Sequence, residues 1–265
     1  MDGTPAILLD EVRWSTGGTT ILKPVSLAFA ADRMNVILGP NGAGKSTLMR
    51  IAAGRLRPTG GRVLYGDRDA FTMDAKELAL RRAFLSQHVE IDFAITVEEV
   101  VLMGRYPHFA RAPGREDRHI VDAALELVGM VDRRRQIYPT LSGGEQQRVQ
   151  LARVLAQVWS DEHPPAPRTI FLDEPIASLD VHHQLQILEV VRTLLGKRCT
   201  IIVTLHDLNL AMSYGDRLLF MRDGGLQEIV EEPATVSADL VQRIFDVRST
   251  ALDDEDGNRV LRFHL

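Results

Sequence analysis

Residues 39–46 have the types and spacing of a loop that binds phosphate groups. Glycines recur where the backbone must curl to point several N–H groups at one anion, and the positive end of a helix follows. Lys45 supplies a full charge for the β- and γ-phosphates, and the Ser46 hydroxyl suits Mg²⁺. The pattern G-x-x-x-x-G-K-[ST] between an apolar strand and a helix predicts a nucleotide-binding loop. Its expected phosphate-contacting residues are Gly39, Pro40, Asn41, Gly42, Ala43, Gly44, Lys45, Ser46 and Thr47.

Two carboxylates, Asp173 and Glu174, end the apolar run at 170–172. In an open α/β sheet the C-terminal ends of buried strands face the crevice where ligands bind. We therefore expect Asp173 to hold Mg²⁺ opposite Ser46. Glu174 is the expected general base, which orients and deprotonates the attacking water. The structural alternative is a solvated acidic turn, and a phosphate-binding loop in the same chain argues against it.

A second glycine-rich helix start lies at Ser142, Gly143 and Gly144. Ser142 followed by Glu145 three residues later has the sequence of a capping box, which is a local role. Two glycines in a first helical turn lower the stability of the helix by about 1 kcal/mol each relative to alanine. Glycine at these positions is therefore best explained if another molecule comes close to the backbone there. Because the chain has one phosphate-binding loop, we expect this helix start to face a nucleotide on another copy of the chain.

The run Leu-Ser-Gly-Gly-Glu-Gln-Gln at 141–147, together with the phosphate-binding loop, resembles the ABC ATPase family over almost the whole chain. The resemblance implies that Gln87 senses Mg²⁺ and water and that Asp180 belongs to a loop that crosses between protomers. It also implies that His206 contacts the γ-phosphate. Trp14 stands near the place of the aromatic residue that stacks on adenine, with simple packing as the alternative.

The same resemblance implies a mechanism and its cofactors, ATP and Mg²⁺. Two copies would pair head to tail and hold two ATP molecules between the loop at 39–47 of one copy and residues 142–144 of the other. Hydrolysis would then reset the pair. The expected catalytic residues are Lys45, Gln87, Glu174 and His206, and the expected metal ligands are Ser46, Gln87 and Asp173.

The expected elements predict an α/β nucleotide-binding core with an inserted helical subdomain. The resemblance implies that this is the P-loop NTPase core of the ABC ATPases, with an antiparallel β-subdomain. Strands are expected at 34–38, 169–172 and 200–205, where apolar runs are continuous. Helical spacing covers much of 97–159. The expected single domain has a nucleotide-binding core at 1–87 and 167–250, a helical subdomain at 88–160, and a C-terminal tail at 251–265 without an assigned function.

Composition limits the partners and the location. Lys and Arg number 31 against 36 Asp and Glu, so the net charge of −5 disfavours nucleic acid as the main partner. Apolar runs are strand-sized, well below the roughly 20 residues of a membrane span, and no secretory signal pattern is present. The single cysteine, Cys199, forms no internal disulfide, which indicates a reducing compartment. Together with these limits, the resemblance to ABC ATPases implies a peripheral protein at the cytoplasmic face of the bacterial inner membrane.

The importer type is indicated by two further resemblances. Residues 92–108 are similar to the permease-docking stretch in the ATPases of iron-siderophore, haem and cobalamin importers. Residues 145–159 and the Pro-rich stretch after them are most similar to haemin-importer ATPases. This implies haem uptake with a separate permease dimer and, indirectly, a periplasmic binding protein. Ferric siderophore and cobalamin stay open as cargo, and an ATP-dependent switch without transport is the alternative from another class.

Overall fold

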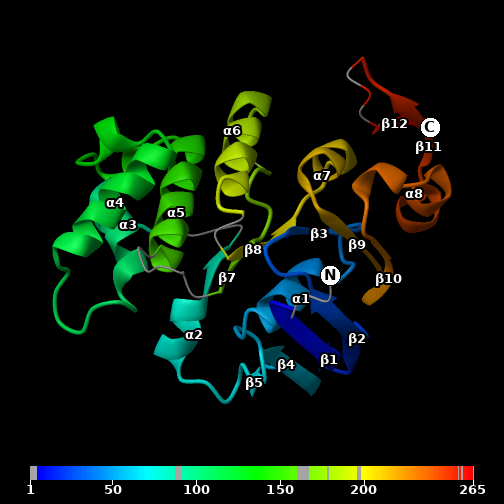
Figure 1. Ribbon diagram of the computed structural model, residues 1–265, viewed down its shortest axis with the longest axis horizontal. Helices are drawn as coiled ribbons and strands as arrows, with labels where there is room; N and C mark the ends of the chain where they lie inside the picture. Colours follow the sequence, from blue (N-terminus) through cyan, green and yellow to red (C-terminus); the bar gives the residue numbers. More distant parts are fainter. Residues whose placement is uncertain are drawn as a thin grey trace. The chain divides into compact units, whose positions relative to one another are not determined.

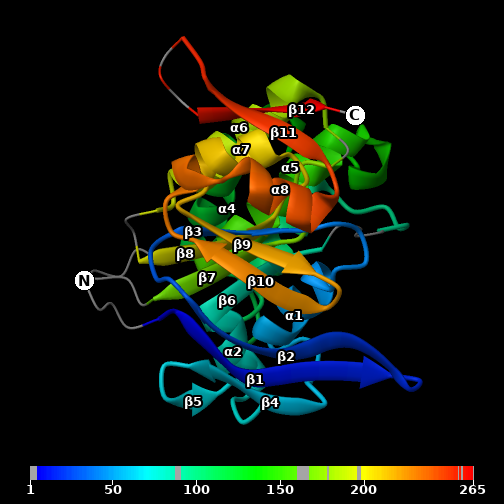
Figure 2. The same cartoon turned by 90° about the vertical axis from the view of Figure 1, so that its right-hand side faces the viewer.

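The computed structural model describes residues 5–86, 91–159, 167–177, 179–195, 198–255, 257 and 259–264. Its backbone contacts divide the chain into two units, one of Met1–Thr72 with Thr200–Leu265 and one of Met73–Cys199. Figures 1 and 2 label the elements of both units. The predicted boundaries of the nucleotide-binding core (1–87 and 167–250) and of the helical subdomain (88–160) differ from those of these two units. The predicted division into subdomains stays a prediction.

The first unit contains an antiparallel sheet with the strand order β2–β1–β4–β5. Leu9 of β1 lies opposite Leu27 of β2, and both are buried while alternate residues reach the surface. This pattern is typical of a sheet with one face on the core, and it confirms the antiparallel part of the predicted fold. The strands are β1 (Ile7–Thr16), β2 (Thr19–Phe29), β4 (Gly60–Tyr65) and β5 (Arg68–Asp69).

The second sheet of the first unit carries the glycine-rich loop. Its central strand, β3 (Met34–Leu38), is buried along its whole length, as the apolar run predicts. It runs parallel to β8 (Cys199–Thr204) on one side and to β9 (Arg217–Arg222) on the other. β10 (Gly225–Val230) pairs antiparallel with β9 and forms a hairpin with it.

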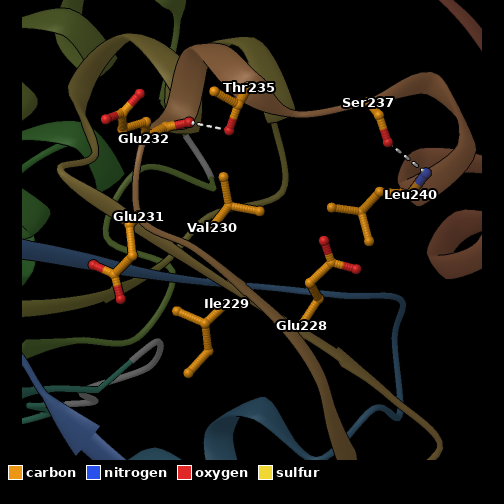
Figure 3. Close-up of a pocket in the computed structure, with 8 residues that line it drawn as sticks. All are labelled: Glu228, Ile229, Val230, Glu231, Glu232, Thr235, Ser237 and Leu240. Atoms are coloured by element: carbon orange, nitrogen blue, oxygen red, sulfur yellow. Dashed lines mark hydrogen bonds between the residues drawn. The ribbon is translucent and has the colours of Figure 1, made fainter.

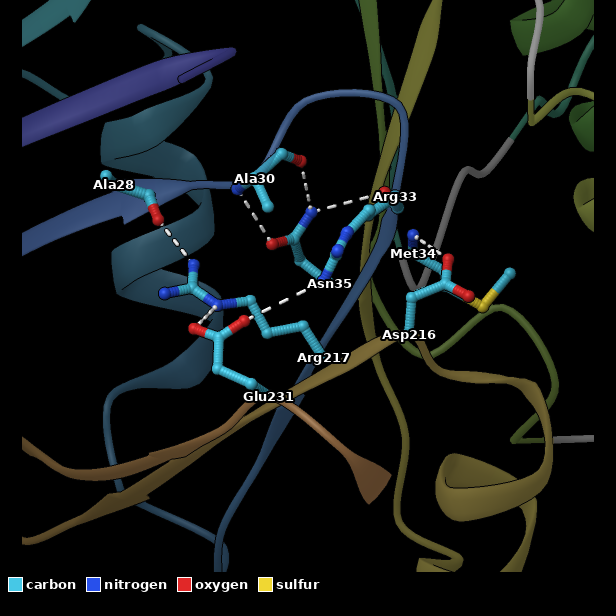
Figure 4. A network of polar contacts seen from close by, with 8 residues as sticks. All are labelled: Ala28, Ala30, Arg33, Met34, Asn35, Asp216, Arg217 and Glu231. Atoms are coloured by element: carbon cyan, nitrogen blue, oxygen red, sulfur yellow. Dashed lines mark hydrogen bonds and ion pairs between the residues drawn. The ribbon is translucent and has the colours of Figure 1, made fainter. Parts of the chain in front are cut away.

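A polar network fixes the start of β3 (Figure 4). Asn35 is fully buried, and its side-chain amide donates to the Ala30 carbonyl at 2.9 Å and accepts from the Ala30 N–H at 3.1 Å. The Asp216 carboxylate accepts from the Met34 N–H at 2.7 Å. Because these groups are satisfied on burial, they hold the strand that leads into the loop in one position.

Three helices and a terminal hairpin complete the first unit. The helices are α1 (Lys45–Ala52), α7 (Leu208–Tyr214) and α8 (Ala238–Phe245), with a 3-10 turn, η4 (Pro233–Thr235), before α8. The C-terminal tail forms the hairpin of β11 (Arg248–Asp253) and β12 (Arg259–His264). The Asn209 side chain of α7 donates to the Leu261 carbonyl at 3.2 Å and accepts from its N–H at 2.8 Å. The tail is therefore attached to α7.

The second unit combines a parallel strand pair with helices. β6 (Arg82–Leu85) pairs in parallel with β7 (Arg168–Leu172). α3, α4 and α5 pack on one another (Figure 1), which confirms the predicted helical character of this stretch. In the described residues, no helix has the length and apolar character of a membrane span. The helices are α2 (Ala75–Arg81), α3 (Val97–Leu102), η1 (Met103–Arg105), α4 (Arg115–Leu127), η2 (Val131–Arg133), η3 (Tyr138–Thr140), α5 (Gly143–Val158) and α6 (Val181–Arg192).

Candidate functional site

Three glycines give the loop after β3 its curl. Gly39, Gly42 and Gly44 have backbone φ angles of 153°, 80° and 92°, which L-residues other than glycine rarely adopt. A Cβ on Gly39 would lie 2.2 Å from the Met221 carbonyl oxygen, and one on Gly44 would lie 3.0 Å from the Ile21 carbonyl oxygen. The loop therefore requires glycine both for its backbone angles and for space.

Lys45 folds back over this loop. The residue is 6% exposed, and its Nζ donates to the carbonyl oxygens of Gly39 at 2.8 Å and Pro40 at 3.1 Å. A buried ammonium group is costly unless such bonds compensate for the lost water. The loop thus holds a positive charge in a fixed place, where an anion gains from it.

The start of α1 adds backbone N–H groups next to the loop. Its N-cap residue is Gly44, which offers no side-chain acceptor, and the first turn contains no acidic residue. The first N–H groups of a helix lack partners within the helix, and this end of the helix is positive. Ser46 and Thr47 lie half-buried in the same turn. The loop and the helix start together fit a phosphate group.

The two predicted carboxylates directly follow β7. Asp173 is 3% exposed, and its N–H continues the strand pairing by donating to the Leu85 carbonyl at 3.0 Å. Glu174 has a φ of 51°, which is uncommon for a residue other than glycine. Strained backbone of this kind gathers at functional sites. The structure therefore places Glu174 in a sharp turn at the C-terminal end of a buried strand.

Ser142 caps α5 through the predicted capping box. Its Oγ accepts from the Glu145 N–H at 3.4 Å, and the Glu145 carboxylate accepts from the Ser142 N–H at 2.9 Å and the Ser142 hydroxyl at 2.8 Å. The bond from the Ser142 backbone, followed by that from its hydroxyl, lowers the pKa of Glu145. The ionised Glu145 carboxylate therefore stabilises the start of α5 at neutral pH. This contribution to the stability of the folded protein is lost as the pH falls through the lowered pKa of Glu145.

The two glycines after Ser142 leave the first turn of α5 bare. A Cβ on Gly143 would meet nothing within 4 Å, and one on Gly144 would meet the Leu179 side chain at 3.3 Å. Packing inside the described chain therefore does not require glycine at position 143. The space beside Gly143 is open, and the expected approach of another molecule to this helix start stays a prediction.

Gln147 joins this helix to the turn that contains Glu174. Its side-chain amide donates to the Pro175 carbonyl at 2.9 Å, and Pro175 directly follows Glu174. The bond connects two of the predicted site segments within the second unit. Gln147 was not among the predicted site residues. Its position early in the helix that Ser142 caps is the sequence signal that could have identified it as one.

Known proteins similar to this chain identify its family. The hemin import ATP-binding protein HmuV of Rhodopseudomonas palustris (strain HaA2) is 42% identical over 245 residues, 92% of either chain. The protein of the same name from Bradyrhizobium diazoefficiens is 45% identical over 231 residues, 87% of this chain and 85% of its own. The family model described as ABC transporter matches residues 22–177. The chain belongs to the ABC transporter family.

A solved structure supports the fold of this ABC ATPase. It is a dimeric ATP-binding cassette in a post-hydrolysis state, bound to ADP and Pi. It matches with a TM-score of 0.73 and 26% identity over 85% of this chain and 98% of its own. The predicted P-loop NTPase fold of the ABC type is confirmed. As an ABC ATPase domain, the chain binds nucleotide and hydrolyses ATP.

The other residues that the resemblance to ABC ATPases indicated lie in both units. In the first unit, His206 is exposed just after β8, and Trp14 is half-buried in β1 between two shifts of the strand register. In the second unit, Asp180 caps α6 by accepting from the His183 N–H at 3.0 Å, and this bond lowers the pKa of Asp180. Gln87 lies outside the described residues, so its expected role stays a prediction.

A hollow of about 320 Å³ beside β10 and α8 has a different character (Figure 3). Three glutamates line it, and none of the predicted site residues does. Glu228 is ion-paired with Arg243, and Glu231 lies 2.8 Å from Arg217. Two of the three carboxylates that line the hollow are therefore paired with basic side chains.

Proposed function

We propose that this ABC ATPase drives haem import through a separate membrane permease. The supporting observation is the 42% identity to a hemin import ATP-binding protein across 92% of either chain. We expect the permease to dock on the stretch at 92–108. The ATPase would lie at the cytoplasmic face of the inner membrane and would receive its transport signal from a periplasmic binding protein through the permease.

Within this function, each predicted site residue has a chemical role. The loop at 39–47 binds the phosphates of ATP, with Lys45 as the fixed charge, and Glu174 accepts a proton from the attacking water. Ser46, Asp173 and Gln87 offer the oxygen donors that Mg²⁺ prefers. When bound, Mg²⁺ supplies charge that stabilises the phosphates during transfer. His206 contacts the γ-phosphate, and Trp14 stacks on the base.

The working form is proposed to be a head-to-tail dimer of this chain. A Cβ on Gly143 would meet nothing within 4 Å, so the turn at 142–144 leaves room there for a phosphate of the partner's ATP. Asp180 would belong to the loop between protomers. The similar cassette described above is itself a dimer bound to ADP and Pi, which supports the same assembly here.

Replacing Ser142 by alanine tests whether this turn does more than cap a helix. We expect S142A to lower the free energy of unfolding by about 0.5–2 kcal/mol, as for other lost N-caps. It should also lower the ATPase rate, because a hydroxyl that faces the partner's ATP is missing. Chemical denaturation and steady-state ATPase assays measure the two effects.

Ser237 provides the matched control, because it caps α8 by accepting from the Leu240 N–H at 3.1 Å. S237A should lose similar stability and keep its ATPase rate. Equal ATPase rates for S142A and S237A would show that Ser142 acts as a cap alone.

The proposed function is tested with the chain reconstituted with its permease in lipid vesicles. Haem-loaded binding protein should raise the ATPase rate by about 5-fold or more, the lower end of typical coupling between sites. Binding protein without cargo and binding protein loaded with a ferric siderophore are the comparisons. Stimulation by the siderophore-loaded form, but not by the haem-loaded form, would overturn haem as the cargo. A reconstituted complex that no loaded binding protein stimulates would overturn the importer function.

A further inference from the structure

The segment from Gly104 to His108 lies directly on the C-terminal end of α5, the helix that Ser142 caps at its other end. A Cβ on Gly104 would come within 2.2 Å of the Arg153 carbonyl oxygen and 3.2 Å of the Gln157 nitrogen. The two backbones are therefore in close contact, and a side chain at position 104 has no room. Figure 1 shows α3, which leads into this segment, beside α5.

Arg105 binds the last carbonyl groups of α5. The residue is 3% exposed, and its guanidinium donates to the Ala156 carbonyl at 2.8 Å and the Trp159 carbonyl at 3.1 Å. The final carbonyl groups of a helix lack partners within it, and this end of the helix is negative. A buried guanidinium with several donors in one plane suits this position better than any other side chain.

Asp117 balances the charge of Arg105 from a second helix. Its Oδ1 accepts from the Arg105 Nε at 3.0 Å, and its Oδ2 accepts from the Gly114 N–H at the start of α4 at 2.8 Å. Burial alone would raise the pKa of Asp117, but the Gly114 N–H and the Arg105 guanidinium hold it below its usual value. The pair thus links the beginning of α4 to the end of α5.

His108 and Gln157 extend these contacts to the strand β6. The His108 Nε2 donates to the Gln157 carbonyl at 2.7 Å, and burial lowers the pKa of His108, which keeps the ring neutral. The Gln157 side chain donates to the carbonyl oxygens of Ala79 and Arg82, at 2.9 Å each. The end of α5 is therefore held on two sides.

The outer side of the same segment is exposed. Tyr106, between Arg105 and the half-buried Pro107, is 60% exposed and meets Phe109 edge to face at 5.7 Å between ring centroids. The segment thus exposes the Tyr106 ring on one side and directs polar groups to the helix end on the other. Gly104, Arg105 and His108 contact α5, and we call these three residues the helix-end clamp.

We propose that Arg105 is a positioning residue of the helix-end clamp, which carries movement of the 104–109 segment along α5 to the turn at 142–144. α5 has 16 residues, so at 1.5 Å per residue it spans about 24 Å as a rigid lever. This inference rests on the proposed function, because the movement that it transmits comes from the permease. It adds a route by which the permease controls the turn that faces the partner's ATP.

The test is an R105K variant in the reconstituted complex, with R111K as its control. A lysine keeps the charge, but its single nitrogen cannot reproduce the planar fork in which Nε binds Asp117 and Nη1 binds the two carbonyl groups. Arg111 is exposed. We expect R105K to lower the ratio of stimulated to basal ATPase rate by about 5-fold or more, with the KM for ATP unchanged. R111K should keep the wild-type ratio. The stimulus is whichever loaded binding protein activates the wild type.

A structural role without coupling gives a different result. If R105K lowers basal and stimulated rates by the same factor, or keeps the wild-type ratio, the clamp proposal is wrong while the importer function stands. If no loaded binding protein stimulates the wild type, the importer function fails, and the coupling role fails with it.

Variants of His108 decide the matter should R105K fail to fold. H108F removes the donor to the Gln157 carbonyl, whereas the amide of H108Q restores a donor of similar reach. We expect the stimulated-to-basal ratio to fall in H108F and to recover in H108Q. A wild-type ratio in H108F, or an equal loss in both variants, would overturn the proposal.

Discussion

An E174Q variant should bind ATP as well as the wild type and hydrolyse it about 10²- to 10⁴-fold more slowly, the range expected for loss of a general base. Glutamine has the shape of glutamate but cannot take a proton from water. The turn after β7 holds the residue at a φ of 51°, and the substitution changes neither the backbone nor the buried Asp173 beside it. The effect should therefore appear in kcat and leave the affinity for ATP unchanged.

The same variant should accumulate as a dimer when ATP is present. Because ATP would stay between the two copies, the step that separates them would be slow. Steady-state phosphate release measures the rate, and sedimentation with and without ATP measures the assembly. E126Q on the exposed side of α4 makes the same change of charge and should behave as the wild type. A wild-type rate in E174Q would exclude Glu174 as the general base.

The chemistry-bearing segments were predictable because their signals are local. The loop at 39–46 follows a strand that is buried on both faces, and the carboxylates follow another, so the residue pattern alone indicates their places at strand ends. The capping box of Ser142 and Glu145 likewise lies within four consecutive residues, so it can be recognised directly in the sequence. Each of these motifs can therefore be recognised from residues that are neighbours in the sequence.

Two elements that were not among the sequence predictions, α8 and the β11–β12 hairpin, also have local sequence signals. α8 follows a Ser237 cap, and its apolar residues Leu240, Val241 and Ile244 are buried at helical spacing. The hairpin of β11 and β12 spans an Asp-Gly pair at 256–257, a common hairpin sequence. These elements could have been predicted from the sequence.

Other features depend on contacts that a sequence does not display. Charged residues are seldom fully buried. Arg105 is an exception because its guanidinium binds the carbonyl group of Ala156, and the sequence does not show this contact because the two residues are 51 positions apart. The bond from Gln147 to Pro175 crosses 28 residues. The φ of Glu174 follows from the turn after β7, and glutamate as a residue type gives no sign of it.

A K45A variant should bind ATP about 10- to 100-fold more weakly, because a hydrogen bond to a charged group contributes about 1.5–3 kcal/mol. In the wild type, the carbonyl groups of Gly39 and Pro40 hold the ammonium beside the loop. The variant loses both the charge and its fixed position. Its ATPase rate should fall as well, in contrast to E174Q, which keeps its affinity.

Isothermal titration with ATP measures the affinity of K45A, and thermal unfolding without nucleotide shows whether the variant is folded. K76A is the matched control, because Lys76 is exposed on α2 and alanine is favourable in a helix. K76A should bind ATP as the wild type does. Because the uncapped start of α1 remains in K45A, residual weak binding is expected from its N–H groups. Undiminished ATP affinity in a folded K45A would mean that the nucleotide does not bind at the loop after β3.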